Sequence, residues 1–76
     1  MISFAEVQEV VDGLRSDGCE SAGRELSEAN VGVFNSLELA MKWRFYVQRA
    51  LSLSAISQST RVKAQALFDK LEAELS

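Results

Sequence analysis

Apolar residues near the start of the chain recur at helical spacing, with polar residues between them. At about 100° per residue they fall within about 120° of arc, the width of a stripe that packs against one neighbour. The stripe consists of Phe4, Val7, Val10, Val11 and Leu14. Ser3 stands before it with Glu6 three positions later, which is the pattern of a capping box, and Ile2 is placed to pack onto Val7. The pattern predicts a helix over residues 4–16.

A second, shorter helix is predicted over residues 18–29. Asp17 and Gly18 end the first helix, and Asp17 can also cap the second one, with Glu20 in the third position. The apolar residues of this segment, which we expect to be buried, are Ala22, Leu26 and Ala29. Residues 30–34 then form a connection.

The third predicted helix, residues 36–53, is far more apolar than the others. Asn35 is its expected cap with Glu38 reaching back, and Phe34 is placed to pack onto Leu39. Its apolar residues span roughly 240° of the helical wheel. They are Leu37, Leu39, Ala40, Met41, Trp43, Tyr46, Val47, Ala50, Leu51 and Leu53. We expect this helix to be the axis of a bundle, covered on several sides, with a second copy of the chain completing the cover if its own helices do not.

A serine-rich break precedes the last helix, which is predicted over residues 58–75. Its stripe is about 100° wide and consists of Ala64, Leu67, Phe68, Leu71 and Leu75. The alternation of a strand is sustained nowhere in the sequence. The sequence therefore predicts one all-α domain, residues 1–76, in which three long helices and one short helix pack around a central apolar helix.

Length and composition restrict the chain further. Its 76 residues, 47% of them hydrophobic, suit one folded domain that is marginally stable unless it associates. A single cysteine, Cys19, excludes an internal disulfide, and without histidine a structural zinc site is not expected. One thiol fits a reducing compartment, and neither a signal peptide nor a membrane span is apparent. We expect a cytoplasmic protein without metal or cofactor.

Charge is segregated along the chain, whose net charge is −3. Residues 39–68 contain no Asp or Glu, whereas the segments on both sides are acidic. The cations of this middle segment are Lys42, Arg44, Arg49, Arg61 and Lys63. Such segregation orients the helices as they pack, and charge that is left over orients a partner.

Catalytic chemistry has little support in this sequence. Histidine, the usual general base, is absent. No glycine-rich phosphate loop, Cys-x-x-Cys or zinc-protease motif occurs. The carboxylate pair Glu6 and Glu9 fits a solvated helix face, and Cys19 lacks the cationic neighbour that activates a thiol. We therefore do not expect an enzyme.

Residues 42–49 interleave basic and aromatic residues, as segments that bind nucleic acids do. On the wheel, however, Trp43 and Tyr46 lie on the apolar arc, where packing in the core is the expected role. A nucleic-acid-binding regulator is the alternative function, and its cations would be Lys42, Arg49, Arg61 and Lys63. Against a net negative molecule these cations form a weak footprint for phosphate.

Two residues of the third helix break its pattern. Arg44 falls inside the apolar arc, where a guanidinium needs a partner because an unpaired buried charge is costly. Either its stem lies along apolar surface and its head pairs with Asp12, Glu25 or Glu28, or it lines a cleft or interface. Phe45 lies beside the polar wedge of the helix, which fits either an interface hot spot or a side chain covered by a loop or the second helix.

The turn and helix containing Gly18, Cys19, Ala22 and Leu26, together with the helix start Ser36-Leu37-Glu38 that runs on to Arg44, resemble uncharacterised small all-helical bacterial proteins. The resemblance covers about half of the chain and is carried by short motifs. It implies a helical fold. Because that group has no assigned activity, the resemblance implies no function.

The sequence is thus most typical of a small, non-catalytic module for protein–protein interaction. By analogy of class alone, bacterial or phage proteins of this kind are accessory, immunity or inhibitor proteins that bind a larger partner. We expect a protein partner or self-association as a homodimer, and neither a membrane nor a small-molecule substrate. The predicted partner-binding residues are Phe45, Lys42, Arg49 and Arg44.

Overall fold

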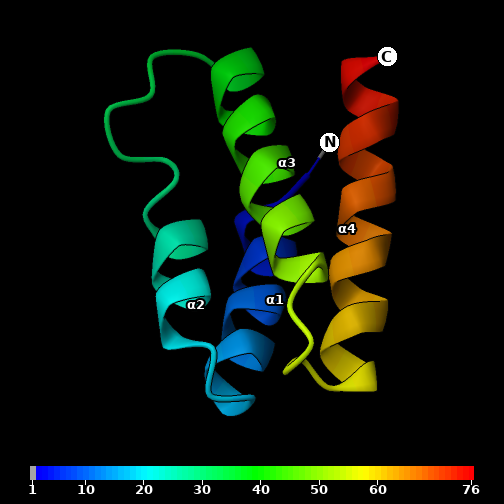
Figure 1. Ribbon diagram of the computed structural model, residues 1–76. Helices are drawn as coiled ribbons and strands as arrows, with labels where there is room; N and C mark the ends of the chain where they lie inside the picture. Colours follow the sequence, from blue (N-terminus) through cyan, green and yellow to red (C-terminus); the bar gives the residue numbers. More distant parts are fainter. Residues whose placement is uncertain (1) are drawn as a thin grey trace.

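A computed structural model describes residues 2–76 of the chain and confirms the all-α class. The described residues form four helices and no strand, with 73% in helix. The helices are α1 (Phe4–Ser16), α2 (Glu20–Ser27), α3 (Ser36–Leu51) and α4 (Gln58–Leu75). Consecutive helices run in opposite directions, so three long helices and one short helix form an up-and-down bundle (Figure 1).

The core receives side chains from every helix, so α2 takes part in the bundle although it is short. The fully or nearly buried apolar residues of the core are Val7, Val10, Val11, Leu14, Leu26, Ala29, Trp43, Val47, Ala50, Ile56, Ala64, Leu67 and Leu71. The stripes of α1 and α4 therefore face the core as their spacing predicts, although Phe68 and Leu75 of α4 are only partly buried. Phe4 of α1 is 62% exposed. Phe4 lies at the rim of the core, where its ring meets that of Trp43 edge to face, with centroids 5.2 Å apart.

Helix α3 is buried on one side only. It packs against α4 and α2, and α1 likewise packs against α2 and α4. In Figure 1, α3 lies in front of α1, with α2 and α4 to its two sides. Trp43, Val47 and Ala50 of α3 enter the core, but Leu37 and Met41 are 60% and 57% exposed. The apolar arc of α3 is thus wider than the other three helices cover.

Two of the predicted helix starts are confirmed in atomic detail. The Ser3 side chain accepts a hydrogen bond from the backbone N–H of Glu6 (3.2 Å), and Asn35 Oδ1 accepts one from the backbone N–H of Glu38 (2.8 Å). The predicted packing of Phe34 onto Leu39 is wrong, because Phe34 is 91% exposed.

The predicted second helix is too long at both ends. Gly18 has a φ of 81°, in the left-handed region that favours glycine, so the chain turns there instead of beginning a helix. The residue before α2 is Cys19, which makes no side-chain capping bond, and the helix ends at Ser27. The expectation that Asp17 caps this helix is therefore wrong. The third helix likewise stops earlier than predicted, at Leu51.

Asp17 instead stabilises the start of α4. Its Oδ2 accepts a hydrogen bond of 2.8 Å from the backbone N–H of Ser57, the N-cap residue of that helix. This N–H, and next the Thr60 hydroxyl, hold the pKa of Asp17 below its ordinary value, because they favour the ionised carboxylate. A negative charge at a helix N-terminus is favourable as well. One side chain thus ties the α1–α2 turn to the beginning of α4.

Two more contacts hold the same end of the bundle together. Helices α1 and α4 approach closely at Gly13, where a Cβ atom would lie 2.5 Å from Oγ1 of the buried Thr60. Arg61 of α4 donates to the carbonyl oxygen of Leu51 (3.0 Å), the last residue of α3, and to that of Leu53 (3.3 Å) in the connection that follows. The serine-rich connection is therefore fixed from both sides.

Candidate functional site

The uncovered side of α3 presents three large apolar residues in a row. Leu37, Met41 and Phe45 follow one another at intervals of four residues, which places them on one face of the helix. They are 60%, 57% and 54% exposed. We call the surface formed by this row and the polar residues beside it the outer face of α3, defined by Leu37, Glu38, Met41, Lys42, Arg44, Phe45 and Arg49.

The middle of the outer face is shallowly hollowed. A depression of about 510 Å³ lies there, and the residues that line it are Glu38, Met41, Lys42, Arg44, Phe45 and Tyr46. All of them belong to α3, so the depression is formed by one rigid helix and requires no movement between elements. Of the four residues predicted to bind a partner, the structure places Lys42, Arg44 and Phe45 around the depression and Arg49 next to it.

Phe45 is held in place although it is exposed. Its ring meets that of Tyr46 edge to face, with centroids 5.2 Å apart, and the Arg49 guanidinium lies 5.7 Å from its ring centre. Neither a connection nor α2 covers it, since more than half of its surface remains accessible. Of the two interpretations of Phe45 from the sequence, burial under a neighbouring segment is therefore wrong.

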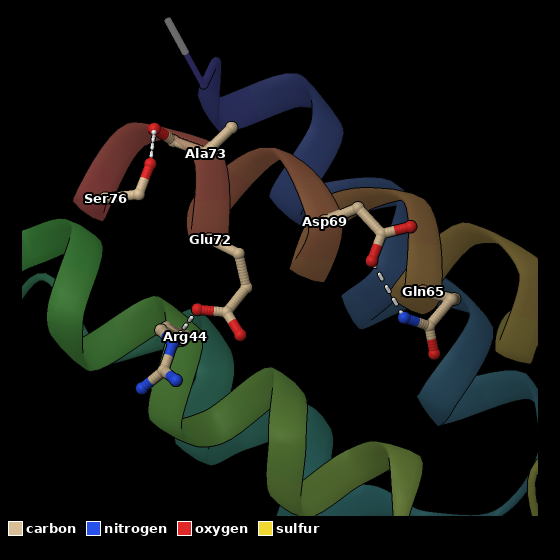
Figure 2. Close-up of polar contacts among 6 residues, drawn as sticks. All are labelled: Arg44, Gln65, Asp69, Glu72, Ala73 and Ser76. Carbon is tan, nitrogen blue, oxygen red and sulfur yellow. Dashed lines mark hydrogen bonds and ion pairs between the residues drawn. The ribbon is translucent and has the colours of Figure 1, made fainter.

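Arg44 pairs with a different helix from the one expected. Its Nε donates to Glu72 Oε2 of α4 at 2.9 Å (Figure 2). Its guanidinium carbon lies 5.6 Å from the ring centre of Phe68. The predicted partners Asp12, Glu25 and Glu28 are wrong, because this side of α3 packs on α4. The side chain is 39% exposed, so Arg44 borders the outer face with its charge balanced.

The other two cations lie on the side of α3 nearer α2. Arg49 Nη1 lies 3.4 Å from Glu25 Oε2 of α2, in an ion pair that is more than half exposed on the arginine side. Lys42 is partly buried and makes no ion pair or hydrogen bond within residues 2–76. Lys42 is therefore the cation of the outer face whose charge is left for a partner.

The remaining cations of the nucleic-acid alternative do not join this surface. Arg61 is engaged with the two carbonyl groups at the end of α3. Lys63 lies in a groove between α1 and α4 that also contains Glu6, Glu9 and Lys70. The surroundings therefore differ among Arg49, Arg61 and Lys63. Carboxylates lie near Arg49 and near Lys63. The basic middle of the sequence does not become one basic patch.

A second apolar groove lies at the end of the bundle where α1 and α3 begin and α4 ends. Its volume is about 270 Å³, and its walls include Phe4, Leu37, Leu39 and Trp43. Leu37 thus belongs both to this groove and to the outer face of α3. In the part of the chain that the structure describes, no group of carboxylates and thiols is arranged to hold a metal ion.

Sequence reasoning missed two of the features that shape this site. It did not foresee Tyr46 at the edge of the depression, because the wheel places that residue on the apolar arc. It also did not name Glu38 as a binding residue, although the wheel places Glu38 in the polar wedge beside Phe45. The spacing of Glu38, Met41, Lys42 and Phe45 at intervals of three and four residues was the signal that could have joined them.

None of the helices that the structure describes is both long enough and apolar enough to cross a bilayer. Comparison of the chain with protein-family models, with curated proteins and with solved structures found no match. The residues of the outer face of α3 and their surroundings are therefore the basis for a functional assignment.

Proposed function

We propose that this protein is a small, non-catalytic module for protein–protein interaction that binds through the outer face of α3. The observation that carries the proposal is the exposed row of Leu37, Met41 and Phe45 on a helix whose opposite side is core. The transfer of apolar surface from water into an interface is favourable, so burial of these three side chains in a complex would stabilise that complex.

The composition of the outer face supports a protein partner. Aromatic residues, Met and Arg are enriched in interfaces, and this face combines Phe45, Tyr46, Met41 and Arg44. Phe45 has the position of an anchor, since Tyr46 and Arg49 already restrict its ring before binding. An anchor that is fixed in advance loses little side-chain entropy when it is buried.

The same charges make nucleic acid the weaker candidate. Phosphate binding needs several unpaired cations on one surface. Here Arg44 and Arg49 are paired with carboxylates, and Lys42 is the cation of this face that lacks an ion pair within residues 2–76. The single cysteine fits a module of the cytoplasm, where thiols stay reduced.

The proposal is tested by placing a charge on the anchor. Phe45→Asp should abolish capture of a protein from extract of the cells that make this chain, whereas wild-type protein retains it. Val62→Asp is the matched control, because Val62 is 58% exposed on α4, away from the outer face. Capture that is equal for all three proteins, or that disappears with nuclease treatment or moderate salt, would refute the proposal.

A further inference from the structure

We propose that the partner of this face is a second copy of the chain, packed as an antiparallel pair of α3 helices around a twofold axis at Met41. This inference rests on the proposed function, because it names the occupant of the same surface. It follows from two kinds of self-complementarity on the outer face of α3, one apolar and one of charge. Isologous contacts of this type are the commonest basis of homodimers.

The apolar row is symmetric about its centre. Leu37 and Phe45 lie four residues before and after Met41, so a twofold axis at Met41 sets Leu37 of each copy level with Phe45 of the other along the helix axis. Met41 then meets its own equivalent, and a flexible thioether fills the space between two such side chains well.

The charged residues match under the same axis. Glu38 and Lys42 lie on the same side of the row, four residues apart. With a rise of about 1.5 Å per residue, Glu38 lies about 4.5 Å before Met41 and Lys42 about 1.5 Å after it. The twofold rotation brings Lys42 of the second copy to about 3 Å from Glu38 along the helix axis, within the reach of both side chains. The dimer thus forms this ion pair twice. The same rotation sets the two Lys42 residues about 3 Å apart along the axis, but each has a Glu38 of the other copy on its outer side, so two attractive contacts outweigh one repulsive contact.

The other cations do not oppose this arrangement. In an antiparallel pair each edge of α3 meets the same edge of the other copy. Arg44 lies on the opposite edge from Lys42, and its charge is balanced by Glu72. Arg49 lies further along the helix, beyond the ends of the apolar row, and is balanced by Glu25.

A parallel dimer is disfavoured by the same positions. A twofold axis parallel to the helices sets the edge with Lys42 against the edge with Arg44 of the other copy. These two cations would then lie about 3 Å apart along the helix axis. Neither edge would gain a new ion pair, so the parallel dimer lacks the two Glu38–Lys42 contacts that offset like charge in the antiparallel dimer.

Reversing the charges tests the geometry directly. Glu38→Lys and Lys42→Glu each replace two attractive contacts by two repulsive ones, so each variant alone should self-associate at least about tenfold more weakly than wild type. When the two variants are mixed in equal amounts, the lysines of one face the glutamates of the other. We expect a heterodimer with an affinity close to that of the wild-type dimer, measured by sedimentation equilibrium.

Two matched variants control for charge and position. Glu20→Lys reverses a first-turn acid of α2, and Lys63→Glu reverses an exposed cation of α4; both should dimerise as wild type does. If Glu38→Lys fails to fold, Glu38→Gln removes the ion pair without reversing the charge and should weaken the dimer about threefold. Circular dichroism verifies the fold of each variant.

Three results would overturn the inference. They are a wild-type chain that stays monomeric up to submillimolar concentration, single variants that dimerise normally, and a mixture that does not regain affinity. Each of them would leave the proposed function open, because capture of a different protein through Phe45 is measured separately. Loss of that capture in Phe45→Asp together with a monomeric wild type would identify the partner as another protein.

Discussion

Two aromatic residues of α3, Trp43 and Phe45, should differ sharply in their contribution to the stability of the fold. Trp43 is 5% exposed and lies in contact with Phe4, so Trp43→Ala leaves a large cavity in the core. Substitutions of this kind cost about 3–5 kcal/mol. A 76-residue domain has a free energy of unfolding of roughly 4–11 kcal/mol. Trp43→Ala therefore removes about a quarter or more of the stability.

Phe45→Ala should cost far less. Full burial of a phenylalanine side chain is worth about 1.5–3 kcal/mol, and Phe45 is 54% exposed, so burial contributes roughly half of that. The edge-to-face contact with Tyr46 adds about 0.5 kcal/mol or slightly more. We expect a loss of about 1–2 kcal/mol, hence a fall in Tm of roughly 4–16 °C.

Urea unfolding followed by circular dichroism measures both values, and low protein concentration keeps association from adding to them. Fluorescence is unsuitable because Trp43 is the only tryptophan of the chain. A loss for Phe45→Ala that equals the loss for Trp43→Ala would show that Phe45 is a core residue. The outer face of α3 would then lack the exposed anchor that a binding surface needs.

Three further measurements test other parts of the structure. Gly13→Ala should lower Tm despite the higher helix propensity of alanine, because its Cβ meets the buried Thr60, and combining it with Thr60→Ala should reduce this extra cost. Asp17→Asn should destabilise most near neutral pH: the folded pKa of Asp17 is lowered, so its contribution is present above the ordinary carboxyl pKa and is lost as pH falls toward the folded value. Thermal melts over a pH series would contradict this if the difference in Tm between wild type and Asp17→Asn stayed constant with pH. A double-mutant cycle on Arg44 and Glu72 should give a coupling below about 1 kcal/mol, since both side chains are well exposed; a coupling above about 2 kcal/mol would mean that the pair is shielded from water.

Local signals predicted the helices well. The bounds of α1 and α4 and the caps Ser3 and Asn35 follow from side chains within a few residues of each helix end. Such contacts depend on the chain itself and not on which helices become neighbours. Trp43 was placed correctly in the core for a similar reason, since the centre of a wide apolar arc faces inward in any bundle.

Features that depend on the choice of neighbour could not be predicted in this way. Asp17 is close in sequence to the start of α2, which the sequence favours as the helix it caps. In the fold its partner is Ser57 at the start of α4, 40 residues away in the sequence. Arg44 was assigned to an acid of the N-terminal half because most acids lie there, yet packing of α3 on α4 brings Glu72 closer. The four predicted binding residues do border one surface, because helical spacing places Lys42 and Arg49 on one side of Phe45 and Arg44 on the other.

The fixed connection between α3 and α4 has a consequence for the thermodynamics of binding. A serine-rich segment of this kind is normally a flexible hinge, and a hinge would let α3 tilt and would have to be ordered by any partner. Here Arg61 holds the carbonyl groups at its beginning and Asp17 holds Ser57 at its end. The orientation of α3 is therefore set before any encounter, and a partner meets a surface whose conformational entropy was already lost during folding.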